Sequence, residues 1–238
     1  GTELAALIKT HHNRIDLIEE LIAQGRVIEP LAQLYKDEVR DLGTQLGLPD
    51  SIVWRHPFPG PGLAVRCLCS EGTMPLEDLS SVESEASRIA EGANLDLRIL
   101  PIKSVGGQGD FRSYAYPAVI WGNADGDNLE EVSTRLTNGI KLINRVVYLL
   151  APEHLPMLKL KRAFLSVERL DLLRKIDDLA MSSLELSGRI QDVSQMPTVM
   201  LPLSTNGKHE VVVFRPISTP DFMTARFTEL PRESFPST

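Results

Sequence analysis

The sequence predicts a mixed α/β (α+β) fold, in which small mixed β-sheets carry packed helices. Segments with helical periodicity alternate with short runs rich in Val, Ile and Tyr, and part of this order occurs twice. The hydrophobic content of 42% is sufficient for a packed core. Because aromatic residues make up only 5%, aliphatic side chains must form most of that core.

Residues 1–60 predict helices followed by an irregular segment. The helical patterns cover 14–25 and 36–47, and the second places acidic residues in its first turn, where the helix dipole favours them. Residues 56–62 contain three prolines and two glycines, which exclude a helix or a regular strand. This composition fits a rigid linker, and a functional loop could use the same stiffness.

After this segment, strands and helices are expected to alternate. The strand patterns are 63–68, 96–105, 114–121, 143–150, 198–203 and 210–217. The helix patterns are 76–91, 129–142 and 158–183. A Ser-Thr-Asn-Gly turn at 204–207 is expected to join the last two strands.

An internal repeat is visible within this alternation. Residues 99–102 followed by the strand 114–121 parallel residues 199–203 followed by the strand 210–217. The first copy continues into a helix and a further strand, whereas the second has no such continuation before residue 238. We therefore expect an incomplete second copy, in a piece of a longer protein.

The overall charge excludes some classes of function. The net charge of −7 and the pI of about 5.3 argue against a broad nucleic-acid-binding face, although a single nucleotide needs only one or two cations. No apolar run approaches the ~20 residues needed to cross a bilayer, so we expect no membrane association and a cytoplasmic location. Cys67 and Cys69 lack the spacing of a zinc site and are expected to be reduced thiols; no metal site is predicted.

The most reactive stretch is Lys9, Thr10, His11, His12 and Asn13. It places an ammonium, two imidazoles, a hydroxyl and an amide together, and such a group could bind phosphates and supply a general base. The alternative is a helix N-terminus that Asn13 caps, with solvated histidines.

Two further candidates lie later in the chain. Residues 106–112 form a glycine-rich segment whose backbone could approach an anion, and Arg112 offers a planar pair of donors for a phosphate or a base edge. The alternative is an ordinary loop in which Asp110 and Arg112 pair with each other. From the sequence around it, Gln195 is predicted to be a surface residue.

Several segments, taken in order, resemble the GMP synthetases. The most specific is RHPFPGPGLAVR at 55–66. The others are IKTHHN at 8–13, KDEVR…LGLP at 36–49, SVGGQGDFRSY at 104–114, INRVVY at 143–148 and DFMTA at 221–225. The resemblance covers almost the whole chain and is weakest at 70–95 and 122–185.

This resemblance implies an activity and a domain order. Complete members use ATP to adenylate XMP, and ammonia from glutamine then displaces AMP to give GMP. Their parts are a glutaminase domain or subunit, an ATP pyrophosphatase domain and a dimerisation region, which imply XMP, glutaminase and a second copy of the chain as partners. The chain would then contain the tail of the α/β pyrophosphatase domain at 1–60, a first dimerisation subdomain at 61–155, a helical connector at 156–187 and an incomplete second subdomain at 188–238.

The resemblance also implies roles for the candidate residues. Lys9, Thr10, His11, His12 and Asn13 match the catalytic lid that closes over ATP and XMP. Arg112 matches an arginine that contacts XMP, and Gln195 matches a glutamine of the XMP pocket in the longer form of the family. ATP and Mg²⁺ would be bound mostly outside this chain, because the phosphate loop is absent from the sequence. The chain alone is therefore expected to be inactive.

Two alternatives remain at this stage. One is a non-catalytic dimerisation or interaction module. The other is a piece of another pyrophosphatase-loop ligase, because the KDEVR…LGLP pattern recurs in NAD synthetases and tRNA-thiolating enzymes. The HPFPGPG run favours the GMP synthetases over the second alternative.

Overall fold

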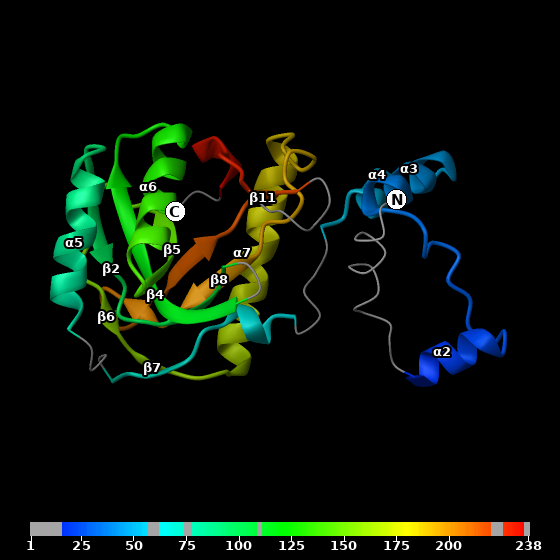
Figure 1. Cartoon of the computed structure of the whole chain (residues 1–238), viewed down its shortest axis with the longest axis horizontal. Coiled ribbons are helices and arrows are strands. Elements are labelled where there is room, and N and C mark those ends of the chain that lie inside the picture. The colour runs from blue at the N-terminus through cyan, green and yellow to red at the C-terminus, as the bar shows by residue number, and fades with distance from the viewer. Residues whose placement is uncertain (1–15, 57–61, 74–77, 109–110, 220–225, 236–238) are drawn as a thin grey trace. The chain divides into compact units, whose positions relative to one another are not determined.

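The computed structural model describes residues 16–56, 62–73, 78–108, 111–219 and 226–235. It divides the chain into two compact units, Gly1–Val53 and Trp54–Thr238 (Figure 1). The expected fold class is confirmed, since helices pack with several small sheets.

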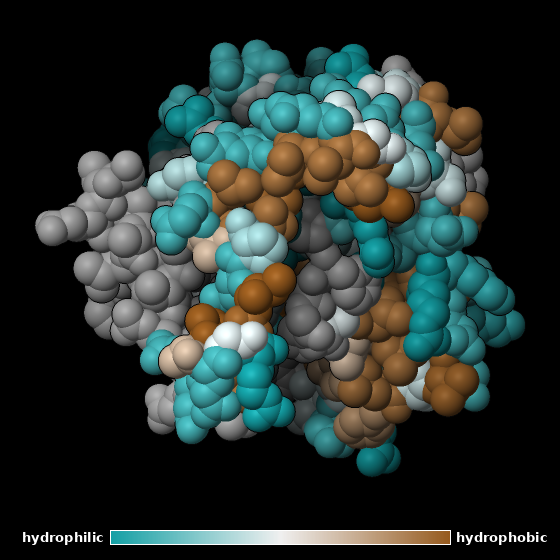
Figure 2. All heavy atoms as spheres, turned by 90° about the vertical axis from the view of Figure 1, so that its right-hand side faces the viewer, coloured by the Kyte–Doolittle hydropathy of each residue, from teal (hydrophilic) through white to brown (hydrophobic). Residues whose placement is uncertain are grey.

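The first unit contains the helices α2 (Asp16–Ala23), α3 (Lys36–Gln45) and α4 (Asp50–Val53). The two predicted helices are thus confirmed, and Gly47, with φ +75°, follows the end of α3. Of the residues in this unit whose burial is described, only Gly43 and Val53 are buried. Large apolar side chains such as Ile28, Leu46 and Ile52 remain exposed, and hydrophobic and hydrophilic residues are interspersed on the face drawn in Figure 2.

The second unit is built around the long strand β4 (Phe111–Gly122). Strands β2 (Leu95–Ile99) and β3 (Ser104–Gln108) pair with it antiparallel, and β5 (Ile143–Tyr148) pairs with it parallel. The parallel pairing requires a crossover, which α6 (Gly126–Gly139) supplies. Helix α5 (Leu79–Glu91) packs beside β2, and its N-cap is Asp78, whose carboxylate accepts from the Ser80 amide at 3.0 Å.

The core of this sheet is apolar. Ala86 and Ala90 of α5 and Val132 and Leu136 of α6 are buried against inward-facing residues of β2, β4 and β5. The predicted strand 96–105 divides into β2 and β3, because the chain turns at Leu100-Pro101 and the Ile102 amide donates to the Leu100 carbonyl at 2.8 Å.

The remaining elements include the long helix α7 (Val167–Leu186). The others are the strands β1 (Ser70–Glu71), β6 (Lys159–Leu160), β7 (Arg162–Ala163), β8 (Thr198–Leu201), β9 (Leu203–Ser204), β10 (Val211–Phe214), β11 (Ile217–Ser218) and β12 (Arg226–Phe227), and the 3₁₀ turns Ala64–Arg66 and Arg232–Ser234. Helix α7 packs on β8, and β8 forms an antiparallel hairpin with β10 (Figure 1).

Two sequence predictions were wrong in this region. The expected strand 63–68 instead contains a 3₁₀ turn at Ala64–Arg66, because Arg66 turns inward to an ion pair with Asp177 of α7 at 2.6 Å. The expected helix 158–183 begins only at Val167, where the Ser166 hydroxyl accepts from the Arg169 amide at 3.3 Å. The residues before this cap form β6 and β7, which pair with β9 and β1.

The repeat seen in the sequence is also a structural repeat. We call residues 95–148 the first copy and residues 198–218 the second copy. Each contains a strand that ends in a Leu-Pro turn and pairs antiparallel with the next long strand. Leu100 and Ile102 of the first copy and Leu201 and Leu203 of the second are buried in one hydrophobic cluster, so the two copies pack against each other there.

Within the part of the chain that the structure describes, no helix combines the length and the apolar character needed to cross a membrane.

Candidate functional site

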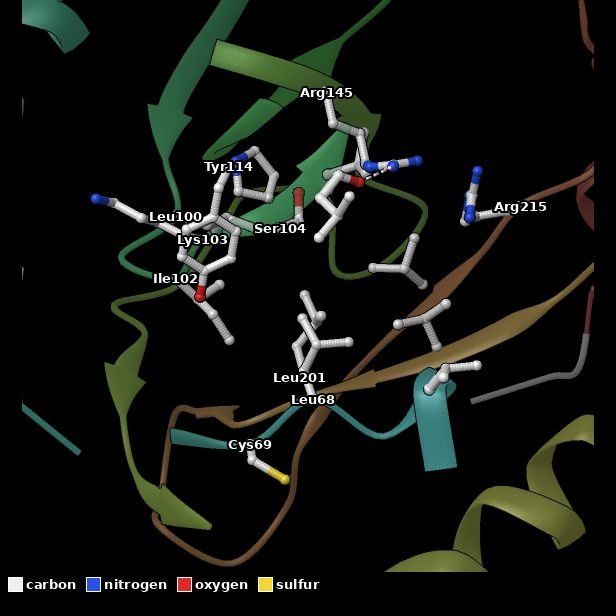
Figure 3. A pocket seen from close by; sticks show the side chains of 16 residues that line it. Leu68, Cys69, Leu100, Ile102, Lys103, Ser104, Tyr114, Arg145, Leu201 and Arg215 are labelled. Atoms are coloured by element: carbon white, nitrogen blue, oxygen red, sulfur yellow. Dashed lines mark hydrogen bonds between the residues drawn. The ribbon is translucent and has the colours of Figure 1, made fainter. Parts of the chain in front are cut away.

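A cavity of about 360 Å³ lies between the two copies of the repeat. The first copy contributes residues of β3, β4 and β5 and of the turn after β2, and the second contributes residues of β8 and β10 (Figure 3). Val65, Leu68 and Cys69 complete its wall. This volume lies in the range of roughly 300–1,000 Å³ that is usual for small-molecule sites.

The floor of the cavity is apolar. It consists mainly of aliphatic side chains from the cluster that joins the two copies: Leu68, Leu100, Ile102, Val147, Val199, Leu201 and Val213. Such a surface favours the apolar or planar body of a ligand, because contact removes hydrocarbon from water.

The charged side chains that line the cavity are all cationic. They are Lys103, Arg145 and Arg215, and no carboxylate occurs among its described lining residues, although the whole chain has a net charge of −7. Arg145 lies on β5 and Arg215 directly after β10, so each copy supplies one arginine. Figure 3 shows the two guanidinium groups on the same side of the cavity.

The two arginines are half-buried and close enough to repel each other. Burial lowers the pKa of Arg145 to about 10, and the charge of Arg215 contributes to this shift. Burial also lowers the pKa of Arg215. Arg145 donates to the Val105 carbonyl at 2.9 Å. Both side chains remain cationic at neutral pH, so the cavity is prepared for an anion.

Neutral polar groups complete the lining. The Ser104 hydroxyl and the Tyr114 side chain belong to it. The Lys103 ammonium lies 5.9 Å from the centroid of the Tyr114 ring and 5.2 Å from that of the buried Tyr116 ring.

The two cysteines differ in exposure. The Cys69 thiol is exposed, whereas Cys67 is buried and burial raises the pKa of its thiol.

The residues predicted from the sequence fall in three places. Lys9, Thr10, His11, His12 and Asn13 lie outside the described residues, as does Asp110. The backbone of Arg112 belongs to β4, where it pairs with Gly107 of β3, and its side chain is outside the description. The glycine-rich segment is therefore largely a strand pair rather than a loop.

Backbone pairing defines the position of Gln195. It pairs with Ile217, whose amide donates to the Gln195 carbonyl at 3.0 Å. Two residues earlier than Ile217, the Arg215 amide donates to the Pro197 carbonyl at 3.1 Å. Gln195 is half-buried and is not among the described residues that line the cavity.

Sequence reasoning missed Arg145 and Arg215. A signal was present, because each is a charged residue inside a strand pattern that is otherwise mostly apolar, INRVVY and VVVFRPI. A buried-strand position occupied by arginine is unusual, since charged side chains are rarely buried without a partner.

Comparison with known proteins shows a similarity to GMP synthases. No family model matches the chain. A probable glutamine-hydrolysing GMP synthase of Leptospira interrogans is 42% identical over 235 residues, which are 98% of this chain and 38% of that protein. The GMP synthases of Oceanobacillus iheyensis and Bacillus subtilis are 48% and 46% identical over 170 residues, which are 62% of this chain and 32% of each relative.

The chain is a homologue of part of the GMP synthases. It spans 38% of the length of the Leptospira relative. This agrees with the resemblance that the motifs carry, and it disfavours a piece of a different pyrophosphatase-loop ligase. Among the described residues, no group of three or more His, Cys, Asp or Glu side chains could hold a metal ion.

Proposed function

We propose that this chain is part of a cytoplasmic GMP synthase, which converts XMP to GMP with ATP, Mg²⁺ and glutamine-derived ammonia. The observation that carries the proposal is identity of 42% to a probable GMP synthase over 98% of the chain. In this reaction ATP adenylates a base oxygen of XMP with release of pyrophosphate. Ammonia then displaces AMP.

The chain would contribute binding elements rather than the whole catalytic machinery. Lys9 to Asn13 would close over ATP and XMP, and Lys9 would balance polyphosphate charge that grows in the transition state. Arg112 and Gln195 would contact XMP. The proposed boundaries are the pyrophosphatase tail at 1–60, the subdomains at 61–155 and 188–238 and the connector at 156–187. The sparse burial in the first unit fits a segment that completes a larger domain.

Arg112 provides the sharpest test in a full-length enzyme that contains this chain. Replacement by alanine removes a charge-assisted hydrogen bond of about 1.5–3 kcal/mol, so XMP affinity should fall roughly ten- to a hundredfold. ATP affinity should change little. XMP and ATP binding and GMP formation from XMP, ATP and ammonia are measured together.

Asp110→Ala is the matched variant. If Arg112 acts only by pairing with Asp110, both alanine variants will change the enzyme alike through the order of the segment. Unchanged XMP affinity in Arg112→Ala contradicts the site, and a full-length enzyme that forms no GMP contradicts the function.

The lid residues have a separate test in the same enzyme. Lys9→Ala and His12→Ala should lower turnover far more than the melting temperature. The 238-residue chain alone should form no GMP, since the sequence has no phosphate loop for ATP. A melting shift of several degrees with normal turnover would favour the helix-cap role of this stretch.

Self-association is proposed as well. Helix α7 exposes Leu172, Leu179 and Leu186, at 47%, 57% and 89%, with a spacing of seven residues that places them along one helical stripe. Such a stripe fits a helix of a second copy. Sedimentation of the chain and of Leu172→Ser/Leu179→Ser should show a dimer in the first case only.

A further inference from the structure

We propose that Asn144 is a positioning residue for Arg112. Its side-chain amide holds the hairpin of β3 and β4, and with it the backbone of Arg112, against the start of β5. This role rests on the proposed function, in which Arg112 contacts XMP, whereas the order of the hairpin is measured independently of that function.

The hairpin depends on contacts from outside its own two strands. Of the described strands, only β3 pairs with residues 111–115 of β4, whereas β2 and β5 pair with residues 116–122. Strand β3 contains Gly106 and Gly107, which have no side chain to pack, and Tyr114 of β4 is 69% exposed. A two-stranded hairpin is only marginally stable by itself, so this one needs an anchor in the rest of the sheet.

Asn144 supplies that anchor to both strands. Its Nδ2 donates to the Ser104 carbonyl of β3 at 2.7 Å, and to the hydroxyl and carbonyl of Ser113 in β4 at 3.3 and 3.4 Å. Its Oδ1 accepts from the Ser104 hydroxyl at 3.2 Å. One half-buried amide therefore donates to both strands and accepts from one of them.

The contact lies directly beside Arg112 in the strand register. Ser113 pairs with Gly106 of β3, and the next pair toward the tip is Arg112 with Gly107. A Cβ at Gly106 would lie 2.8 Å from the Cβ of Asn144, so the glycine is what lets Asn144 approach this closely. Loss of the contact at Ser113 should therefore loosen the backbone of Arg112 first.

Only an amide of this length satisfies both kinds of partner. An aspartate has nearly the same shape, but its carboxylate can only accept hydrogen bonds and would face the carbonyls of Ser104 and Ser113. Asn144→Asp therefore removes the donor without leaving a cavity. Asn144→Ala removes donor and acceptor together and serves as the second variant.

Hydrogen exchange of the 238-residue chain tests the anchor itself. Both Asn144 variants should speed exchange of the amides at 104–108 and 111–115 roughly three- to tenfold, since loss of a net hydrogen bond changes a local opening equilibrium by such a factor. The amides at 118–122 should keep their rates. Asn138→Ala, at an exposed position of α6, is the matched control and should change neither segment.

Steady-state kinetics of a full-length enzyme that contains this chain tests the role toward Arg112. Asn144→Asp should raise the KM for XMP roughly three- to tenfold, because a smaller fraction of the enzyme holds Arg112 in place. The kcat at saturating XMP and the KM for ATP should change by less than about twofold, whereas a general loss of folded enzyme would lower kcat and leave both KM values unchanged.

A double variant shows whether the two residues act as one. Asn144→Asp combined with Arg112→Ala should have the same KM for XMP as Arg112→Ala alone, because Asn144 acts through Arg112. A further rise in the double variant would show that Asn144 acts separately and would overturn the proposal.

The other contradicting results are distinct from one another. Unchanged exchange of the hairpin in Asn144→Asp would show that the amide does not hold it. Faster exchange with an unchanged KM for XMP, in an enzyme whose Arg112→Ala variant has a raised KM, would show that the anchor does not serve XMP binding. An unchanged KM in Arg112→Ala would count against the proposed XMP contact, and the positioning role would fall with it.

Discussion

The two copies of the repeat hold their covering helices in different ways. In the first copy, α5 and α6 pack on the sheet through a continuous apolar cluster that includes Leu136 and Ile120. In the second copy, α7 also has apolar contacts, but it is fixed to its surroundings by ion pairs with buried side chains. Arg66 meets Asp177, and Arg169 meets Glu210 directly before β10.

The difference has a consequence for stability. Apolar packing is not directional, whereas an ion pair fixes which groups meet and becomes costly when one member is missing. Glu210 is the carboxylate that pairs with two cations. Its side chain is 6% exposed and contacts both Lys161 at 3.0 Å and Arg169 at 2.7 Å. We therefore expect the stability of the second copy to depend on individual charged side chains.

Glu210→Gln is expected to have the largest effect. It leaves Arg169 and Lys161 without their shared carboxylate, and loss of one member of a buried pair costs about 3–5 kcal/mol. Urea denaturation should show this loss in the free energy of unfolding.

Glu131→Gln is the control for charge alone. Glu131 pairs with Arg135 on the exposed surface of α6, and such pairs contribute about 0–1 kcal/mol. A cost in Glu210→Gln as small as in this control would contradict the division between the two copies.

Gly106→Ala is the corresponding test of packing in the first copy. A Cβ at Gly106 would lie 2.8 Å from the Cβ of Asn144 and 2.9 Å from the Ser113 hydroxyl oxygen. Asn144 would have to move, and its amide now donates to the Ser104 carbonyl at 2.7 Å, which joins β5 to β3. Overpacking of this kind costs about 1–3 kcal/mol. A melting temperature equal to that of the parent chain would contradict this expectation, because it would show that the strands accommodate the added methyl group without cost.

The same contrast explains how far the sequence could be interpreted. Periodicity predicted α5, α6, β4 and β5, because each depends on a local pattern of apolar residues. It failed at 63–68, where the apolar run predicted a strand, because the conformation is set by the contact of Arg66 with Asp177, far along the chain. A one-dimensional pattern contains no such pairing.

The candidate site shows the same limit. Arg112 and Gln195 were chosen through resemblance to a family, and their proposed roles remain predictions. Arg145 and Arg215 come from different copies and approach each other only when the copies pack. Their strand positions were unusual in the sequence, but their common cavity depends on tertiary structure.

The smallest expected effects come from two exposed glycines, one in each copy. Around both Gly139, at the end of α6, and Gly207, in the hairpin turn of the second copy, a Cβ would meet nothing within 4 Å. They differ in the backbone, because Gly207 has φ +78° and Gly139 does not occupy the left-handed region. Gly139→Ala should therefore stabilise the chain by about 0.4–1 kcal/mol, since it restricts the unfolded state without strain.

Gly207→Ala should have the opposite sign and cost about 1 kcal/mol, because an L-residue is strained at that φ. The turn also depends on the Gly207 amide, which donates to the Ser204 hydroxyl at 2.9 Å, so a shift of the backbone to relieve the strain would lose this bond. Thermal denaturation of the two single variants and of the double variant measures both effects. Since an added Cβ at either site meets no described atom within 4 Å, the two effects should add within about 0.5 kcal/mol. If both variants shift stability in the same direction, local backbone conformation is not what separates these two turns.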